Sequence, residues 1–208
     1  MRLTSLRRLA LVCGATGSGK TTTIAALLEE INQTRAAHIV TLEDPMEYIF
    51  APKRSFISQR ALGRDFLSFP AGVRSALRED PDILLIGEIR DRETMEAALS
   101  AAATGVLVLG TLHTRSAAQT ALRVESMFPA DVRDAVRAAF ADTVTGIFAQ
   151  QLLPCVSGGR VALIEALCAT TAVRNMIRQG HYAQLDSVMM SGAAQGMQTA
   201  AMAEATLR

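Results

Sequence analysis

The chain has 208 residues, of which 50% are hydrophobic and 20% charged, and its formal net charge is +1. This composition is that of a globular protein and excludes a disordered one, and a charge near zero gives no overall sign of binding to nucleic acid or to an anionic membrane. No apolar run approaches the length of a membrane span, so we expect no integral membrane segment.

The first half of the chain predicts strands that alternate with helices. The apolar segment RLALVCG is typical of a buried strand, and the glycine-rich turn after it leads into a helix over about residues 20–33. HIVTLED predicts a second strand that ends in acids, residues 50–64 an irregular loop or hairpin, and residues 70–78 a helix. DILLIGE predicts a third strand.

The second half continues this alternation. DRETMEAALSAAATG predicts a helix closed by Gly105, and VLVLGTLHT predicts a fourth strand. Two helices follow, separated at Pro129, and Asp131 is the expected N-cap of the second. Strands over residues 146–152 and 160–167 are expected to flank a turn at residues 157–159, and the chain is expected to be helical from Thr170 onward.

This order of elements predicts an α/β fold with a mostly parallel central sheet and helices on both of its faces. We expect a core over residues 1–168, followed by a helical C-terminal extension of the same domain over residues 169–208. The three cysteines have neither a paired nor a zinc-binding spacing and suit a reducing cytosol, which predicts a cytoplasmic location.

The stretch GATGSGKTTT, residues 14–23, fits the phosphate-loop pattern of nucleotide-binding proteins. Its glycines let backbone amides turn toward phosphate oxygens, and the N-terminus of the following helix adds partial positive charge. We expect Lys20 to reach the β and γ phosphates of ATP and the Thr21 hydroxyl to ligate Mg²⁺. The alternative is a chance glycine turn before a helix. The residues predicted to bind nucleotide are Gly14, Thr16, Gly17, Ser18, Gly19, Lys20, Thr21 and Thr22.

Acidic residues end two of the predicted strands. Glu43, Asp44 and Glu47 follow the second strand and Glu88 follows the third, at the carboxyl edge of the sheet where ligands bind in α/β folds. One such carboxylate can orient an attacking water, and another can hold Mg²⁺, partly through water. The alternative is that these acids form solvated turns. His113 ends the fourth strand at the same edge, where it could contact a γ-phosphate or could be structural.

In this order and spacing, GATGSGKTTT, LEDPME, RSALREDPDILLIGEIRD and GTLHT resemble the secretion ATPase superfamily of type II secretion and type IV pili. AVRNMIR, residues 172–178, and GMQT, residues 196–199, are similar to signatures of the PilT-type pilus retraction ATPases within it. The resemblance implies a RecA-like phosphate-loop ATPase domain. It also implies three catalytic roles: Glu43 activates water, Glu88 is the Walker B carboxylate near Mg²⁺, and His113 contacts the γ-phosphate.

The resemblance further implies partners and a task. It implies a cytoplasmic homo-hexamer that joins the inner membrane only through the platform protein of a type IV pilus, and that uses ATP and Mg²⁺ to drive pilus disassembly and twitching motility. No nucleic-acid partner is expected, because no basic stripe with interleaved aromatic residues is present. Periodicity alone would make the apolar members of the implied retraction segment packing residues. That segment consists of Ala172, Val173, Arg174, Asn175, Met176, Ile177 and Arg178.

The sequence leaves alternatives open. The family normally has a folded N-terminal domain that supplies arginines, whereas this chain begins almost at the strand before the phosphate loop, so a non-catalytic nucleotide-binding or regulatory module is one alternative. A secretion or pilus-extension ATPase is another, and the AVRNMIR and GMQT segments argue against it. Arg115 and Arg123 are either arginine fingers toward a neighbouring subunit or surface or structural pairs.

Overall fold

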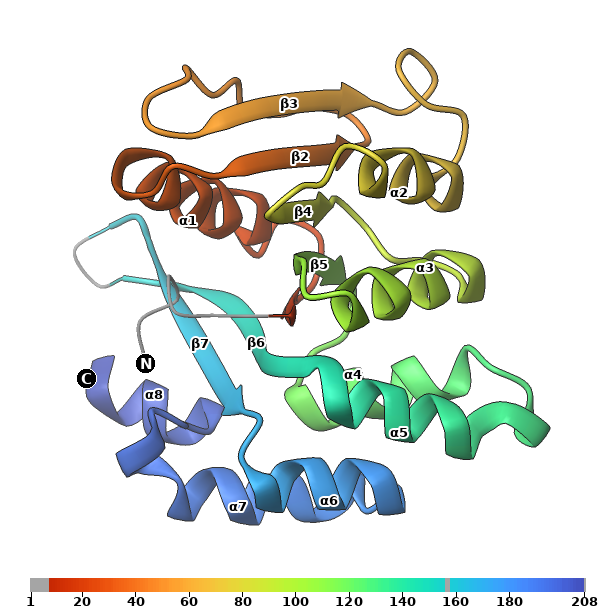
Figure 1. Ribbon diagram of the computed structural model, residues 1–208. Coiled ribbons are helices and arrows are strands. Elements are labelled where there is room, and N and C mark those ends of the chain that lie inside the picture. The colour runs from red at the N-terminus through yellow and green to blue at the C-terminus, as the bar shows by residue number, and fades with distance from the viewer. Residues whose placement is uncertain (1–7, 156–157, 208) are drawn as a thin grey trace. The chain divides into compact units, whose positions relative to one another are not determined.

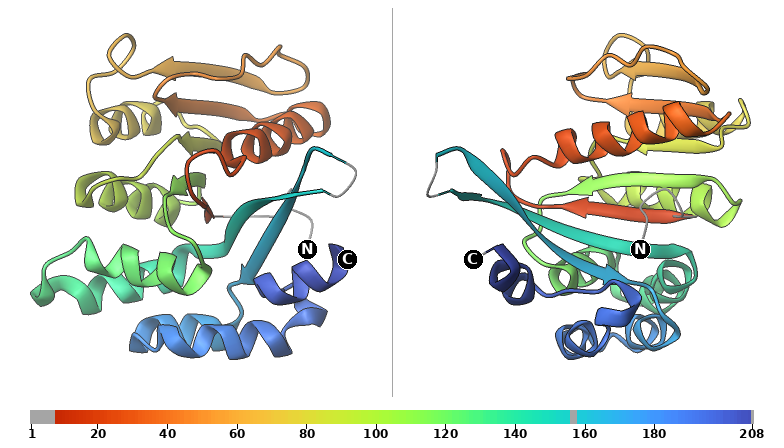
Figure 2. Two further views of the ribbon diagram at one scale, coloured as in Figure 1. Left: turned by 180° about the vertical axis from the view of Figure 1, so that it is seen from behind. Right: turned by 90° about the vertical axis from the view of Figure 1, so that its left-hand side faces the viewer.

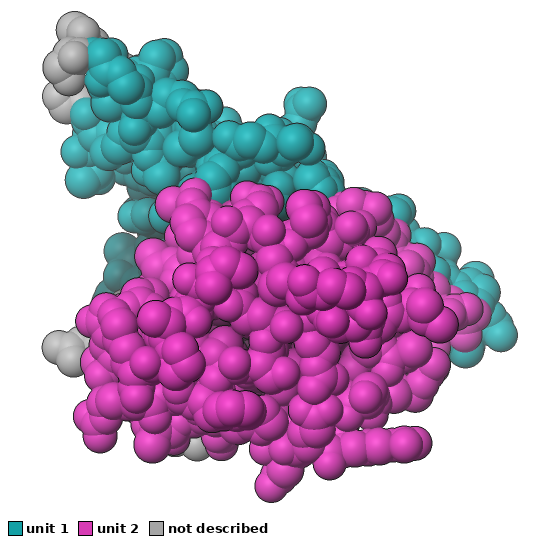
Figure 3. All heavy atoms as spheres, turned by 90° about the horizontal axis from the view of Figure 1, so that it is seen from above, with its two compact units in different colours: residues 1, 11–20, 112–208 teal, residues 2–10, 21–111 magenta. Residues whose placement is uncertain are grey.

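The computed structural model, drawn from three sides in Figure 1 and Figure 2, describes residues 8–155 and 158–207. These residues form two compact units, coloured separately in Figure 3. Described residues of unit 1 come from 11–20 and 112–207, and those of unit 2 from 8–10 and 21–111. The chain therefore passes from unit 1 to unit 2 within the phosphate-loop motif, between Lys20 and Thr21.

Unit 2 is built on parallel strands. Its strands follow the order β3-β2-β4-β5, and β2 pairs in parallel with both β3 and β4, as β4 does with β5. β4 is completely buried and β2 nearly so, which explains why both read as apolar runs in the sequence. The elements that lie wholly or mostly in this unit are α1 (Lys20–Thr34), β2 (His38–Glu43), β3 (Phe56–Ala61), α2 (Phe69–Leu77), β4 (Ile83–Ile86), α3 (Arg92–Ala103) and β5 (Leu107–Leu112).

Unit 1 combines an antiparallel strand pair with helices. Strand β1 (Leu9–Cys13) contributes its last three residues to this unit, and its strands follow the order β1-β6-β7. The whole of β7 (Arg160–Cys168) pairs antiparallel with β6 (Val144–Pro154), from Gly146 opposite Cys168 to Pro154 opposite Arg160. The helical elements of this unit are α4 (Ala117–Ser126), η2 (Ala130–Val132), α5 (Arg133–Thr143), α6 (Thr171–Gln179), η3 (Tyr182–Gln184), α7 (Leu185–Ser191), η4 (Ala193–Gln195) and α8 (Ala200–Leu207).

Side-chain caps fix the start of four helices. In each, a hydroxyl or carboxylate oxygen accepts the backbone N–H three residues further on, which satisfies one of the amides that a helix leaves unpaired at its N-terminus. The capping residues are Ser68 of α2, Asp91 of α3, Ser116 of α4 and Thr170 of α6. Asp91 and Ser116 come shortly after two of the three segments for which the sequence predicts catalytic residues, those of Glu88 and His113, so these caps also fix the ends of those two segments.

The predicted α/β fold with a mostly parallel sheet is confirmed, but the expected loop or hairpin at residues 50–64 is wrong. Residues Phe56–Ala61 form β3, which pairs in parallel with β2, with His38 opposite Phe56 and Glu43 opposite Ala61. β3 is an edge strand of the sheet, and the side chain of Phe56 is exposed. An edge strand has a neighbouring strand on one side only, and the sequence of β3 contains no apolar run. Its backbone pairing therefore cannot be predicted from the hydrophobic pattern.

The expected N-cap role of Asp131 is also wrong. Asp131 lies inside the 3₁₀ turn η2, and α5 begins at Arg133 with no side-chain cap. The backbone N–H of Val132 donates to the carbonyl of Pro129, so this turn satisfies an early amide without a side chain.

The other predicted elements are present with boundaries that differ by a few residues. Gly105 follows α3 with a φ of 104°, and every helical element after β7 lies in the expected helical C-terminal region. The boundary between a core and an extension at residue 168 stays a prediction, and Ser157 of the predicted turn lies outside the described residues. Among the helices that the structure describes, none combines the length and the apolarity that crossing a membrane would require.

Candidate nucleotide-binding site

The phosphate loop of unit 1 follows a strand that is buried throughout. Gly17 and Gly19 have φ angles of 76° and 87°, in the left-handed region that glycine adopts without strain. At Gly14 the constraint is space, because a Cβ atom there would lie 2.3 Å from the carbonyl oxygen of Gln150 and 2.5 Å from Ser18 Oγ. The loop therefore needs its glycines for two different physical reasons.

Two polar side chains lie inside this loop. The ammonium of Lys20 donates to the carbonyl oxygens of Gly14 and Ala15, at 2.8 and 3.0 Å. Ser18 Oγ is buried and has no hydrogen-bond partner among the described residues. A buried hydroxyl without a partner is costly, and an anion rich in acceptors would satisfy it. The glycine backbone, the ammonium and the orphaned hydroxyl together fit a phosphate group.

Gln150 on β6 holds the loop from the side, a role that the sequence pattern does not predict. Its side chain is only 3% exposed, and its Nε2 donates to the carbonyl oxygen of Ser18 at 2.8 Å. A Cβ atom on Gly19 would approach the same Nε2 to 2.8 Å. The available signal was an amide side chain within a strand that is otherwise largely apolar, but the sequence does not say which backbone group that amide binds.

The segment that carries His113 begins next to the phosphate loop. The backbone N–H of Gly14 donates to the carbonyl of Leu112 at 3.2 Å, and the exposed His113 is the next residue. After it, Thr114 and Thr120 share a hydrogen bond of 2.7 Å, and the Thr120 hydroxyl lies 3.0 Å from Cys13 Sγ. Burial raises the pKa of the Cys13 thiol despite this hydrogen bond, so Cys13 is a neutral packing residue at the end of β1.

A buried carboxylate holds the helix that follows His113. Glu165 on β7 accepts the backbone N–H of Ala117, in the first turn of α4, at 2.6 Å. Its neighbour Ala166 exchanges two backbone hydrogen bonds with Gln198, of 2.8 and 3.0 Å. Gln198 belongs to GMQT, so adjacent residues of β7 bind the start of α4 and the C-terminal signature segment.

In unit 2, the first turn of α1 contacts the segment that follows β2. Thr21 Oγ1 donates to Glu47 Oε1 at 3.2 Å, and the Thr22 hydroxyl lies 3.1 Å from the Tyr48 hydroxyl. Thr21 is the predicted Mg²⁺ ligand. A hydroxyl that donates its only hydrogen to a carboxylate keeps its lone pairs available for a cation.

Glu43 and Glu88 lie at the ends of neighbouring parallel strands of unit 2. Leu42 is the register partner of Ile86, and the backbone N–H of Gly87 donates to the carbonyl of Leu42 at 2.8 Å. Glu43 is buried and accepts a hydrogen bond of 2.7 Å from Thr41 Oγ1. The structure thus brings together the two strand ends whose acids the sequence singled out.

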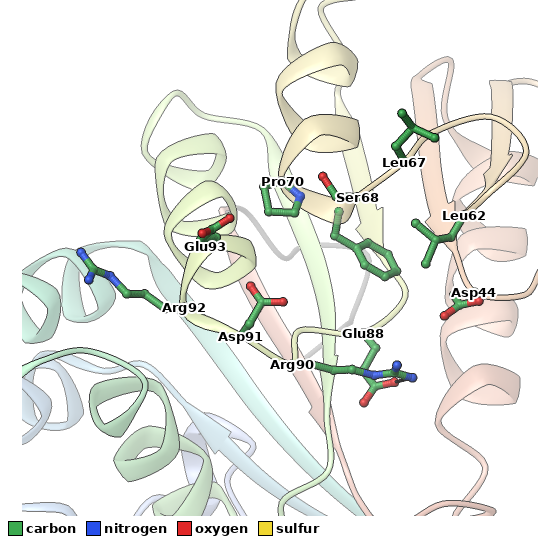
Figure 4. Close-up of a pocket in the computed structure, with 11 residues that line it drawn as sticks. Asp44, Leu62, Leu67, Ser68, Pro70, Glu88, Arg90, Asp91, Arg92 and Glu93 are labelled. Atoms are coloured by element: carbon green, nitrogen blue, oxygen red, sulfur yellow. Dashed lines mark ion pairs between the residues drawn. The ribbon is translucent and has the colours of Figure 1, made fainter.

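Glu88 lines a pocket of about 580 Å³ that lies entirely within unit 2 (Figure 4). Its carboxylate pairs with the guanidinium of Arg90 at 2.6 Å, and this pairing raises the pKa of Arg90. Asp44 approaches the pocket from the end of β2, and Asp91 from the start of α3. The apolar part of the lining consists of Leu62, Leu67, Phe69 and Pro70.

The predicted retraction segment forms most of α6. Val173 and Ile177 are fully buried, so these apolar members are packing residues. Arg174 donates to the carbonyl of Ala141, and Arg178 forms an ion pair with Asp142, both on α5. Ala172 and Asn175 are exposed, and Met176 is half-buried.

The predicted site residues divide between the two units. Unit 1 holds the loop from Gly14 to Lys20 and His113, and unit 2 holds Thr21, Thr22, Glu43 and Glu88. Within the part of the chain that the structure describes, no three His, Cys, Asp or Glu side chains are grouped to hold a metal ion by themselves. Mg²⁺ would instead combine the Thr21 hydroxyl, a carboxylate such as Glu88 and phosphate oxygens, the hard oxygen donors that this ion prefers.

Comparisons with known proteins identify the family of the chain. Residues 2–205 match the family described as "Type II/IV secretion system protein". The chain is 49% identical to the "Type IV pilus retractation ATPase PilT" of Pseudomonas aeruginosa, over 93% of this chain and 56% of that protein. It is 50% identical to the "Twitching motility protein" of Neisseria gonorrhoeae, over 94% of this chain and 52% of that protein.

A solved structure is also similar. It is a crystal structure of the pilus retraction motor PilT with bound ADP, with a TM-score of 0.90 and 46% identity, covering 97% of this chain and 57% of that one. This chain thus spans about half the length of the relatives that it matches. The sequence match and the fold lead to one conclusion: the chain belongs to the type II/IV secretion system protein family.

Proposed function

We propose that this chain is the ATP-hydrolysing motor domain of a type IV pilus retraction ATPase. The single observation that carries the proposal is the phosphate loop, with its glycine backbone, inward ammonium and orphaned Ser18 hydroxyl, in a chain 49% identical to PilT. The proposed assembly is a cytoplasmic homo-hexamer whose partner is the inner-membrane platform protein of a type IV pilus. Its proposed task is pilus disassembly and hence twitching motility.

Nucleotide binding is assigned to the loop and the first turn of α1. Backbone amides of the loop and the ammonium of Lys20 neutralise the phosphates, as the N-terminus of α1 does with its partial charge. Mg²⁺, when bound, neutralises the β and γ phosphate oxygens further. The residues assigned to nucleotide and metal are Gly14, Thr16, Gly17, Ser18, Gly19, Lys20, Thr21 and Thr22, with Glu88 toward the metal.

Hydrolysis is assigned to three side chains. Glu43, held at the end of β2, orients the attacking water and accepts its proton. Glu88 lies at the end of the neighbouring strand β4, where a Walker B carboxylate belongs. His113 follows a residue bonded to Gly14, so it lies beside the start of the phosphate loop and can contact the γ-phosphate.

Two substitutions with matched controls test this function. Lys20→Ala should abolish both ADP binding and ATP hydrolysis, whereas Lys53→Ala, which changes the other lysine of the chain, should leave both unchanged. Glu88→Gln should abolish phosphate release but retain nucleotide binding, whereas the exposed Glu96→Gln on α3 should retain both. Phosphate release and the fluorescence of a labelled ADP are the measurements. Hydrolysis that ignores Lys20→Ala and Glu88→Gln would refute the proposal.

A second candidate is a module that binds nucleotide without turnover. The glycine backbone, the Lys20 ammonium and the Ser18 hydroxyl account for phosphate binding and do not by themselves account for hydrolysis. Light scattering with and without ATP and Mg²⁺ separates the two candidates, when combined with the phosphate-release assay. A hexamer that hydrolyses ATP supports the motor, and a persistent monomer that binds ADP without turnover supports the module.

A further inference from the structure

The side chain of Gln59 on β3 uses every hydrogen-bonding group of its amide. Its Nε2 donates to the carbonyl of Tyr48 at 2.8 Å and to Glu43 Oε1 at 3.3 Å, and its Oε1 accepts the backbone N–H of Phe50 at 2.9 Å. A flipped amide would direct its oxygen at a carbonyl and a carboxylate and its NH₂ group at an N–H. These three partners therefore allow one orientation only.

The register of the sheet places Gln59 beside the carboxylate of Glu43. Thr41 is the register partner of Gln59, and Glu43 lies two residues beyond Thr41, on the same face of β2. Thr41 and Gln59 both donate to one oxygen of Glu43, Oε1. Since both donors use this oxygen, they hold Oε1 in place and leave the other oxygen, Oε2, to a different partner.

The same amide also fixes the segment that touches α1. Tyr48 and Phe50 are the two backbone partners of Gln59, and Glu47 and Tyr48 are the residues that contact Thr21 and Thr22. Gln59 thus joins Glu43 to the segment that holds the first turn of the phosphate-loop helix.

We propose that Gln59 is a positioning residue for ATP hydrolysis, an inference that rests on the proposed function of Glu43 as the base. Its hydrogen bond to Glu43, the catalytic arm, holds the carboxylate so that Oε2 faces the attacking water. Its hydrogen bonds to the backbone of Tyr48 and Phe50, the segment arm, hold residues 47–50 against Thr21 and Thr22. Gln59 touches neither water nor nucleotide in this role, so its loss should reduce the rate of turnover far more than nucleotide binding.

Two variants of Gln59 test the catalytic arm and the segment arm. Gln59→Glu removes the donor to Glu43 and to the Tyr48 carbonyl but keeps an acceptor for the Phe50 amide, and Gln59→Leu removes all three hydrogen bonds. Ser58→Ala is the matched control, because its side chain lies on the opposite face of β3. In Gln59→Glu we expect kcat for ATP to fall by about ten-fold or more, while KM and the Kd for ADP change by less than about three-fold. Exchange of the Phe50 amide, measured without nucleotide, should accelerate in Gln59→Leu but not in Gln59→Glu, which keeps the acceptor of this amide, nor in Ser58→Ala.

A double-substitution cycle connects the effect to Glu43. If Gln59 acts through this carboxylate, Gln59→Glu should cost nothing further in a chain that already carries Glu43→Gln. An unchanged kcat in Gln59→Glu, beside a Glu43→Gln chain that has lost turnover, overturns the inference and leaves the proposed function intact. Full turnover in Glu43→Gln contradicts the assignment of the base, and with it the catalytic arm of the inference. Equal exchange of the Phe50 amide in Gln59→Glu, Gln59→Leu and Ser58→Ala overturns the segment arm, whatever the turnover of the chain.

Discussion

The carboxylate of Glu165 accepts the backbone N–H of Ala117 at 2.6 Å, across 48 residues of sequence. Glu165 is only 7% exposed, and the amide that it binds belongs to the first turn of α4. Since a helix leaves its first amides without partners, this carboxylate acts as a second cap beside Ser116. The start of the helix that follows His113 is therefore fastened to β7.

Replacing Glu165 should measurably destabilise the chain. Glu165→Ala leaves a buried amide without its acceptor, and we expect the free energy of unfolding to fall by about 1–3 kcal/mol. Glu165→Gln keeps an acceptor oxygen and should cost less. Urea denaturation of both variants gives these values, and an Ala variant as stable as the unaltered chain would contradict the cap.

The loss in Glu165→Gln should also depend on pH. Burial, more than the nearby charge of Asp186, raises the pKa of Glu165 above its ordinary 4.5, although the Ala117 amide works in the opposite direction. The folded state therefore holds this proton more tightly than the unfolded state, and the unaltered chain loses stability as the pH rises from 4.5 through the folded pKa. Glu165→Gln has no such proton, so its stability relative to the unaltered chain should improve across that range. Urea midpoints at several pH values check this sign.

Two glycines of the phosphate loop should respond differently to alanine. Both have a positive φ, so either substitution strains the backbone by about 1–2 kcal/mol. At Gly19 the new Cβ would also lie 2.8 Å from Gln150 Nε2, whereas at Gly17 it would meet nothing within 4 Å. We expect Gly19→Ala to cost about 1 kcal/mol more than Gly17→Ala and to weaken ADP binding further. Thermal denaturation and ADP titration measure both effects, and equal losses would contradict the crowding at Gly19.

Adjacent glutamines on β6 provide a matched pair for the loop support. Gln150 is buried and binds the carbonyl of Ser18, and Gln151 is exposed on the other face of the strand. Gln150→Ala should weaken ADP binding by about ten-fold, because the loop loses a hydrogen bond that fixes its backbone. Gln151→Ala should bind ADP like the unaltered chain. Similar affinities for the two variants would show that Gln150 does not support the loop.

The two tyrosines of the chain should differ in their contribution to stability. Burial, and then a hydrogen bond to the carboxylate of Glu125, raises the pKa of the buried Tyr182. Tyr182→Phe removes a hydrogen bond to a charged group and should cost about 1.5–3 kcal/mol. Tyr48→Phe removes only an exposed hydrogen bond to Thr22 and should change stability by about 0.5 kcal/mol at most. Chemical denaturation of the two variants tests the contrast.

The parts of the molecule that the sequence predicts are those in which local pattern and burial agree. β1, β2 and β4 are buried strands with apolar runs, and the phosphate loop needs glycine for reasons that act within a few residues. β3 escaped prediction because its place in the sheet depends on backbone pairing with β2.

The roles of the supporting residues cannot be predicted from the sequence for a related reason. Gln59, Gln150 and Glu165 are polar residues within strands, and each one binds a partner that is distant in sequence. A sequence shows that such a side chain must find a partner when it is buried, but not which one. For Glu43, Glu88 and His113 the order of the motifs predicts a place at the strand ends, and their chemical roles await the experiments above.

The place of β3 at the end of the sheet has a practical consequence for handling the protein. The outer backbone groups of this strand have no strand partner among the described residues, and its first side chain, Phe56, is 67% exposed. An open β edge of this kind can pair with a strand from another molecule. This pairing uses backbone hydrogen bonds and apolar burial, which added salt does not weaken. Concentrated samples should therefore begin to aggregate at this edge, and a lysine in place of Phe56 is the simplest way to keep them in solution.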